Sequence, residues 1–208
     1  MVATLISAAQ LRLFAPRCDY LVMAPAIDAA CVEFAITTPP RICHFLGQLH
    51  HESAGLTRLE ENLNYSAERL MEVWPTRFPT LESATPFARN PRALANKVYG
   101  GRLGNNKVDD GWKHRGSGLI MNTGKANHQR VGDQIGVDLV AAPELLRQPK
   151  IAARAAGAYW ADRGLNALAD SEDLAGITRR VQGGSLGLAE RGRAVRRANA
   201  IWRPNYRP

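Results

Sequence analysis

The stretch that decides the fold of this chain is Pro39–Gly55, PPRICHFLGQLHHESAG. The paired prolines suit the first turn of a helix, and glycine suits the position just past a helix end. Apolar residues recur between them at helical spacing and mark a buried face: Ile42, Phe45, Leu46 and Leu49. The sequence therefore predicts a helix over Pro40–Ala54 with one face in the core.

Glu52 continues this face, three positions after Leu49 and seven after Phe45. We therefore expect its carboxyl to point toward the apolar interior, near the C-terminal end of the helix. Burial and the negative end of the helix dipole both disfavour the ionised form, which is the condition that a proton donor requires. The alternative is a glutamate in the last helical turn that reaches out to water.

A second acidic group follows in Leu59–Ser66, LEENLNYS, which contains Glu60 and Glu61. Two carboxylates, one to protonate a leaving oxygen and one to activate water, are what a glycoside hydrolase needs. Glu60 and Glu61 are adjacent and equally charged, so their chemistry alone does not separate them.

These motifs resemble the catalytic region of glycoside hydrolase family 19, the plant-type chitinases, and more closely its endolysin branch, which phages use to cut peptidoglycan. Further segments match in order between about residues 40 and 200: Asn96–Tyr99, Arg102–Asn105, Asp110–Gly116, Gly118–Ile120, Thr123–Gly124 with Asn127, and Ile177–Arg180 before Gly183–Gly184. The resemblance implies a mainly α, lysozyme-like domain with two helical lobes and a substrate cleft between them.

Carried over by position, the resemblance implies that Glu52 is the general acid and Glu61 the general base. Thr123 matches the hydroxyl residue that helps to hold the attacking water. The positions that bind sugar or orient the carboxylates are matched by His51, Asn127 and Arg191. Tyr65 and Trp112 are candidates for stacking on sugar rings, although large aromatic residues also fill cores.

Four positions depart from the family pattern. Met121 stands where Gln is common and offers no useful donor to a sugar. Gln182 stands where Asn precedes the Gly-Gly pair and is kept as a candidate sugar ligand, while Leu186 replaces another Asn. Ser117 interrupts what is usually an Arg-Gly-Arg-Gly run. These departures concern substrate contacts and leave the acid, the base and the water-holding residue in place.

Periodic segments elsewhere predict further helices over Ser7–Phe14, Ala24–Ile36, Ser66–Trp74, Pro91–Tyr99, Thr123–Ile135, Pro143–Leu146, Ile151–Arg163, Ser171–Val181 and Leu188–Trp202. Ser66, Thr123 and Ser171 are typical helix starts, and Pro143 suits a first turn. The glycine-rich segment Gly100–Gly118 predicts a loop or a short irregular β-hairpin. Since no linker or change of composition divides the chain, we expect a single catalytic domain over residues 1–208, without a separate wall-binding domain.

The formal net charge is +8, and arginines gather at the C-terminal end: Arg179, Arg180, Arg191, Arg193, Arg196, Arg197, Arg203 and Arg207. Such a stripe could attract anionic wall polymers or lipopolysaccharide, or it could be a solvated helix face. Specific nucleic-acid binding is a remote alternative, because no nucleic-acid-binding motif accompanies the charge and the carboxylate pair would be unexplained.

No metal or other cofactor is expected, because neither the five histidines nor the three cysteines show ligand spacing. Cys18, Cys31 and Cys43 fit small buried hydrophobes better than a disulfide framework. Residues 1–14 lack the features of a secretory signal, and no stretch approaches the roughly 18 apolar residues of a membrane span. We therefore expect synthesis in a host bacterial cytoplasm and action in the periplasm or cell wall after holin-type release.

The predicted function is that of an endolysin: a monomeric, inverting glycosidase that cuts β-1,4 bonds of bacterial peptidoglycan glycan strands. Inversion requires the two carboxyl groups to stand about 6.5 to 9.5 Å apart, so that water fits between them. A chitinase, which uses the same acid and base on an uncharged polymer, is the nearer alternative.

Overall fold

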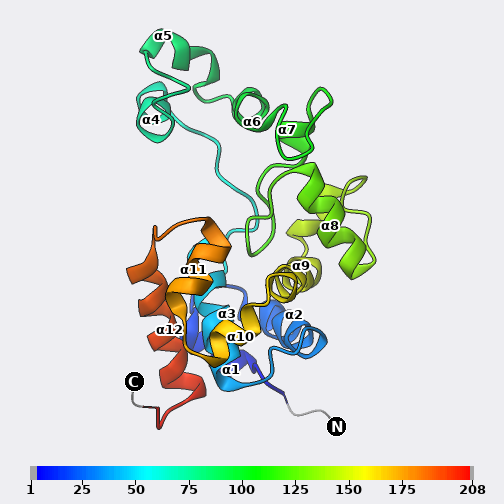
Figure 1. The fold of residues 1–208 in the computed structure, drawn as a ribbon, viewed down its shortest axis with the longest axis vertical. Coiled ribbons are helices and arrows are strands. Elements are labelled where there is room, and N and C mark those ends of the chain that lie inside the picture. Colours follow the sequence, from blue (N-terminus) through cyan, green and yellow to red (C-terminus); the bar gives the residue numbers. More distant parts are fainter. Residues whose placement is uncertain (1–3, 207–208) are drawn as a thin grey trace.

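The computed structural model describes residues 4–206 and is mostly helical, with loops rather than strands between the helices (Figure 1). Over these residues the elements are α1 (Ala8–Phe14), α2 (Tyr20–Glu33), α3 (Pro39–Glu52), α4 (Ala67–Val73), α5 (Leu81–Ala84), the 3-10 helix η1 (Thr85–Phe87), α6 (Pro91–Tyr99), α7 (Asp110–Lys113), α8 (Lys125–Ile135), the 3-10 helix η2 (Pro143–Arg147), α9 (Pro149–Asp162), α10 (Leu165–Asp170), α11 (Leu174–Gln182) and α12 (Leu188–Trp202). The predicted mainly α, lysozyme-like fold is confirmed.

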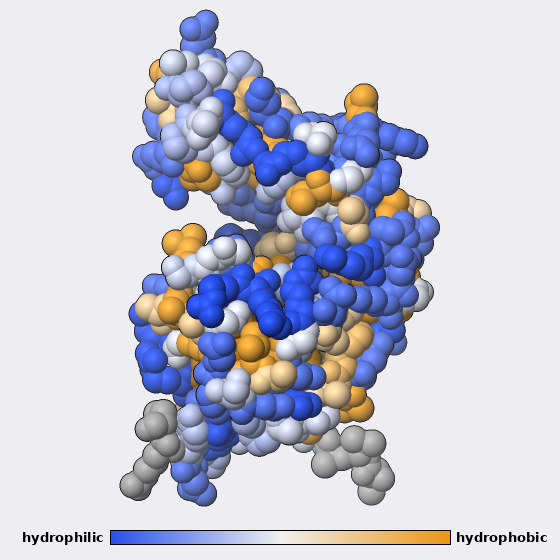
Figure 2. All heavy atoms as spheres, viewed as in Figure 1, coloured by the Kyte–Doolittle hydropathy of each residue, from blue (hydrophilic) through white to orange (hydrophobic). Residues whose placement is uncertain are grey.

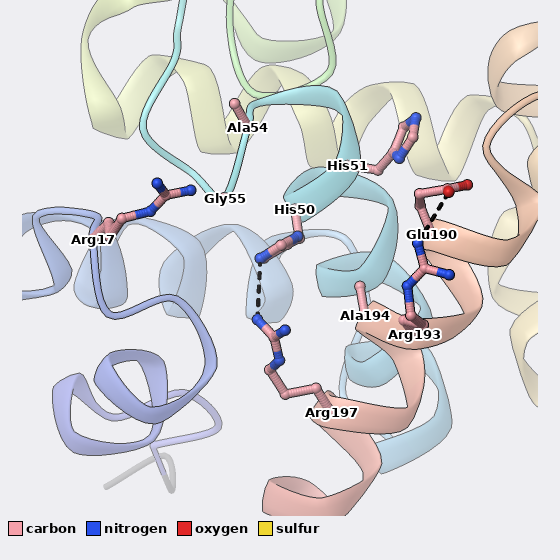
Figure 3. Close-up of a pocket in the computed structure, with 9 residues that line it drawn as sticks. All are labelled: Arg17, His50, His51, Ala54, Gly55, Glu190, Arg193, Ala194 and Arg197. Atoms are coloured by element: carbon pink, nitrogen blue, oxygen red, sulfur yellow. Dashed lines mark hydrogen bonds and ion pairs between the residues drawn. The ribbon is translucent and has the colours of Figure 1, made fainter.

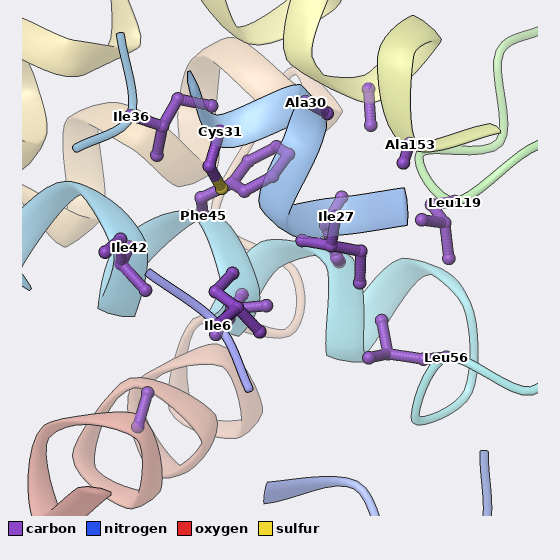
Figure 4. Close-up of a cluster of buried hydrophobic side chains, with 14 of the residues drawn as sticks. Ile6, Ile27, Ala30, Cys31, Ile36, Ile42, Phe45, Leu56, Leu119 and Ala153 are labelled. Carbon is purple, nitrogen blue, oxygen red and sulfur yellow. The ribbon is translucent and has the colours of Figure 1, made fainter. Parts of the chain in front are cut away.

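The larger lobe is built around α3, with α1, α2 and α9 to α12 gathered against it (Figure 1). The predicted apolar face of α3 is buried in the main core, where Phe45 belongs to one cluster with Ile27 of α2 and Ala153 of α9 (Figure 4). Helix α12 packs directly on α3. A Cβ at Gly47 would lie 2.5 Å from Val195 Cγ2, so glycine is what permits this close approach.

The smaller lobe contains α4 to α7 and has its own core around Leu70, Phe78 and Leu94 (Figure 1). The chain leads to it from the end of α3 through a turn over residues 53–57 and then an extended segment over residues 58–66. This segment pairs with the loop after α7 through two backbone hydrogen bonds of 2.9 Å each. Glu61 N–H donates to Gly116 O, and Gly118 N–H donates to Leu59 O. Two far-apart pieces of sequence thus meet between the lobes.

That loop is also fastened to the larger lobe. Leu119 and Ile120 are buried in the main core, and Ser117 forms isolated antiparallel bridges with Glu60 and Asn122. Of the two alternatives for Gly100–Gly118, the loop is confirmed and the β-hairpin is wrong. Within it the one-turn helix α7 forms, which the glycine content had hidden.

Several predicted helix starts are wrong because another side chain caps the helix. Helix α2 begins at Tyr20 rather than Ala24, since Asp19 accepts a hydrogen bond from Val22 N–H. Helix α11 begins at Leu174 rather than Ser171, since Asp173 caps it, and the separate helix α10 precedes it. The start at Ser66 is confirmed, because its hydroxyl accepts from Arg69 N–H.

Thr123 does not cap α8. The helix begins at Lys125, and Gly124 precedes it at a φ of +94°, which leaves the Thr123 hydroxyl free for another task. Cys18, Cys31 and Cys43 are buried as predicted. No helix within residues 4–206 is both long and apolar enough to cross a membrane. Residues 1–3 and 207–208, including Arg207 of the basic stripe, lie outside the described part of the chain.

Candidate active site

The C-terminal turn of α3 places Glu52 at the boundary between the lobes. Ser53 ends the helix and is fully buried, with its hydroxyl donating to Leu49 O at 2.5 Å and accepting from Leu56 N–H at 3.0 Å. Gly55 then turns the chain at a φ of +78°. These local bonds fix the helix end, and with it the position of the Glu52 side chain.

Glu52 does not point into apolar core, so that prediction is wrong. Its side chain is 19% exposed, and its Oε1 accepts a hydrogen bond of 2.5 Å from Nη2 of Arg191, whose own side chain is only 2% exposed. The other terminal nitrogen of Arg191 donates to Gln48 Oε1, one turn before Glu52 on α3. A buried cation from α12 thus orients the carboxylate that the sequence places on α3.

Glu61 lies on the extended segment and is held by neutral donors. Tyr99 OH donates to Oε2 at 2.7 Å, and Gly116 N–H donates to Oε1 at 2.6 Å. Burial raises the pKa of Glu61 above its ordinary value, while the bonds from Tyr99 and Gly116 and the charge of Arg115 work against that rise. Desolvation is therefore the dominant influence on the pKa of this carboxyl.

Thr123 meets Glu61 across Gly116. A Cβ at Gly116 would lie 3.2 Å from both Glu61 Cδ and Thr123 Oγ1, so glycine leaves the space that these two groups share. Thr123 Oγ1 donates to Met121 O at 2.9 Å, and Asn127 Nδ2 donates to Thr123 O at 2.7 Å. The structure therefore brings Thr123 and its brace Asn127 to the predicted base.

Glu60 forms ion pairs with two arginines outside the cavity. Arg115 Nε donates to Glu60 Oε1 at 2.5 Å, and Arg147 Nη1 lies 3.4 Å from Oε2. The Arg115 guanidinium also stacks on Trp112, with its carbon 3.6 Å from the ring centroid. With both oxygens facing arginines, Glu60 is an ion-pair partner, and the geometry favours Glu61 for chemistry.

Glu52 and Glu61 line one cavity of about 300 Å³. Its remaining lining residues are Arg58, Asn62, Tyr65 and Met121. Figure 2 shows a deep notch between the two lobes on this face of the molecule. The sequence had marked Tyr65 as a sugar-stacking residue, but it gave no sign of Arg58 or Asn62.

Three further candidates are not brought to this cavity. His51 lies beside Gly187 at the start of α12, where an added Cβ would be 2.6 Å from its ring. Trp112 packs against the core of the smaller lobe beneath Arg115. Gln182 ends α11, and its Nε2 is buried without a hydrogen-bond partner among residues 4–206. Their roles toward sugar stay predictions.

A buried histidine pair supports the loop that carries Gly116 and Thr123. His128 Nε2 donates to Asn122 O at 3.0 Å, so its Nδ1 is the acceptor that meets His114 Nδ1 at 3.1 Å. This arrangement needs a neutral His128, and burial lowers the pKa of His128 to about 4. Over residues 4–206, no three His, Cys, Asp or Glu side chains converge into a metal site.

Comparison with known proteins gives a consistent picture. No family model matches the chain. A Haemophilus influenzae protein described as a glycosyl hydrolase family 19 domain-containing protein is 38% identical over 149 residues, 71% of this chain and 72% of that protein. Chitinase C from Streptomyces griseus has a similar structure, with a TM-score of 0.69 and 16% identity over 97% of this chain and 94% of that one. A bacterial family 19 chitinase gives a TM-score of 0.58 and 19% identity over 93% and 95%.

Proposed function

The chain belongs to glycosyl hydrolase family 19, and from this premise we propose that it is an endolysin that hydrolyses the glycan strands of bacterial peptidoglycan. The observation that carries the chemistry is the convergence of Glu52 and Glu61 on one cavity, each held by its own set of partners. The net charge of +8 supports an anionic polymer as substrate, because chitin carries no charge and peptidoglycan carries peptide carboxylates. Action on the wall would follow holin-type release from the cytoplasm.

In the proposed reaction Glu52 protonates the glycosidic oxygen. Its Oε1 accepts from Arg191, and a guanidinium can only donate, so the transferred proton belongs on Oε2. Arg191 is thereby a positioning residue: it turns one oxygen of Glu52 toward α12 and leaves the other for the substrate.

Glu61 deprotonates the water that attacks from the opposite side of the sugar. The Thr123 hydroxyl donates its hydrogen bond to Met121 O, so its oxygen is available to accept a hydrogen bond from that water. A water that donates to both Glu61 and Thr123 directs its lone pair away from them, toward the anomeric carbon. Such a direct displacement inverts the configuration at that carbon.

Chitin hydrolysis is the second candidate. The observation that favours it is structural likeness, because both solved proteins compared above are chitinases. The two substrates share β-1,4-linked N-acetylglucosamine, so the same acid and base would serve both.

The test compares the wild-type protein with Glu52→Gln and Glu61→Gln on purified peptidoglycan and on colloidal chitin. Glu60→Gln is the matched control, since it makes the same change next to Glu61. We expect new reducing ends on muropeptides by mass spectrometry, inverted configuration by NMR of the fresh product, and losses above about 100-fold in the first two variants only. Chitin oligomers as the sole product would make the protein a chitinase. Activity that survives in Glu52→Gln would remove Glu52 from the role of acid.

A further inference from the structure

A second cavity, of about 360 Å³, lies beside the C-terminal turn of α3 (Figure 3). Its charged lining comes from three parts of the chain: Arg17 from the turn before α2, His50 and His51 from α3, and Glu190, Arg193 and Arg197 from α12. We call it the arginine pocket. It shares no lining residue with the active-site cavity, although His51 and Glu52 are neighbours in the chain.

The arginine pocket has an excess of positive charge. Glu190 is its one acidic lining residue within the described chain, and Arg193 Nη2 already donates to it at 3.0 Å. Neither Arg17 nor Arg197 has an acidic partner among residues 4–206. Three arginines against one glutamate leave a formal charge of +2 with both histidines neutral.

His50 lies within reach of this charge. Arg197 Nη1 donates to His50 Nε2 at 3.5 Å, so His50 presents a lone pair and is neutral in this contact (Figure 3). Burial and the charges of Arg197, His51 and Arg17 lower the pKa of His50. The pocket thus resists a further cation, and an anion seated in it would relieve that repulsion.

The arginine pocket and the active-site cavity lie at the same end of α3. The same helical turn offers Glu52 to the active-site cavity and His51 to the arginine pocket. In peptidoglycan, a lactyl-linked peptide leaves the glycan strand at every second sugar and ends in carboxylates. We take the branch of a strand bound at Glu52 and Glu61 to reach this pocket, because the two cavities flank the same helical turn.

We propose that the arginine pocket binds a carboxylate of the peptide branch of peptidoglycan, with Arg17 and Arg197 as its principal cationic ligands. This inference rests on the peptidoglycan hydrolysis proposed above and adds a reason for selecting that polymer over chitin. Arginine suits the task, because its planar fork of N–H donors matches a carboxylate.

The test is the double variant Arg17→Gln/Arg197→Gln, with Arg12→Gln/Arg196→Gln as its matched control. The control removes the same charge from exposed arginines in the neighbourhood of the first pair but outside the pocket. Each protein is assayed on soluble glycan fragments with intact peptides, and on the same fragments after conversion of their carboxylates to methylamides. We expect the pocket variant to raise KM about tenfold on intact fragments, with kcat unchanged and with no effect on the methylamides.

Other results would overturn the proposal. An unchanged KM on intact fragments would show that the arginines are solvated, and an equal rise in the control would show a general effect of charge. An equal rise on the methylamides would assign the pocket to the glycan. An unchanged KM combined with weaker binding to lipopolysaccharide vesicles would assign it to that polymer instead. If the wild-type protein cuts chitin and no peptidoglycan at all, the proposed function is wrong, and so is the proposed binding of a peptidoglycan carboxylate in the arginine pocket.

Discussion

Glu52 and Glu61 line the same cavity but are held by different parts of the molecule. Glu52 ends a long helix in the larger lobe, where Arg191 reaches it from the closely packed helix α12. Glu61 lies on an extended segment and is held by a phenol and a backbone N–H from the smaller lobe and the loop after α7. We call these two surroundings the helix wall and the loop wall.

This difference predicts different vulnerabilities. The helix wall depends on one buried cation, so it should fail when that cation is removed. The loop wall depends on burial and on neutral donors, and its loop rests on a histidine pair that must stay uncharged. Protonation of the histidine pair should therefore disturb the loop wall more than the removal of any single charged side chain would.

The largest effect is expected from Arg191→Met, which breaks the helix wall. It leaves the Gln48 amide and the Glu52 carboxylate without their common partner at a buried helix interface. Breaking a buried ion pair from one side costs about 3–5 kcal/mol, so we expect a loss of this size in urea unfolding together with nearly complete loss of turnover. Arg196→Met, on the exposed side of α12, is the control. Equal stability of both variants would show that Arg191 does not support the helix wall.

The helix wall is also the part that the sequence predicts better. The prolines, the apolar spacing and Gly55 predict the bounds of α3 to within two residues, and they place Glu52 near its end. Gln48 is a site residue that was overlooked, although it precedes Glu52 by one helical turn. The partner of both could not be derived from α3 alone, because Arg191 is 139 residues away from Glu52.

The loop wall could be predicted only in part. The family resemblance selects Glu61 over Glu60 by its spacing from the His51-Glu52 pair, and it also implies Thr123, but it gives no physical reason for the choice. That reason lies in the tertiary structure. Glu60 forms ion pairs with Arg115 and Arg147, whereas Glu61 accepts hydrogen bonds from Tyr99 and Gly116. Short helices such as α7 and α10 were missed, since periodicity needs more than one or two turns to show itself.

A smaller effect is expected from acid, through His128 in the support of the loop wall. The pKa of His128 is about 4 in the folded chain against an ordinary value of 6.5. Between pH 6.5 and pH 4, His128 is therefore protonated in the unfolded chain but neutral in the folded chain. Stability is therefore full above about pH 6.5 and falls as the pH drops toward 4, by about 3 kcal/mol in all. Urea unfolding at pH 7 and pH 4.5 measures the difference.

His128→Gln is the matching variant, and it should lose most of this pH dependence. Some should persist, because burial also lowers the pKa of His114. A variant whose pH dependence equals that of the wild type would show that other groups control acid stability, and that the histidine pair is not the weak point of the loop wall.

The smallest effect is expected from Tyr99→Phe, and it decides which wall supplies the base. Removing the hydroxyl takes away a bond that stabilises ionised Glu61, so the pKa of Glu61, already raised by burial, should rise further. A base must be ionised to work, so the acidic limb of the kcat/KM profile should move to higher pH. Near pH 7 the loss should stay within about tenfold, the size of a single hydrogen bond of ~1.4 kcal/mol.

Tyr20→Phe is the control for this variant, because Tyr20 lies on α2 beneath Arg12 and does not line the cavity. Its profile should match that of the wild type. A profile in which Tyr99→Phe moves the basic limb instead would make Glu61 the proton donor, since an acid must be protonated to work. The helix wall would then hold the base, and Arg191 would orient Glu52 toward the attacking water rather than toward the glycosidic oxygen.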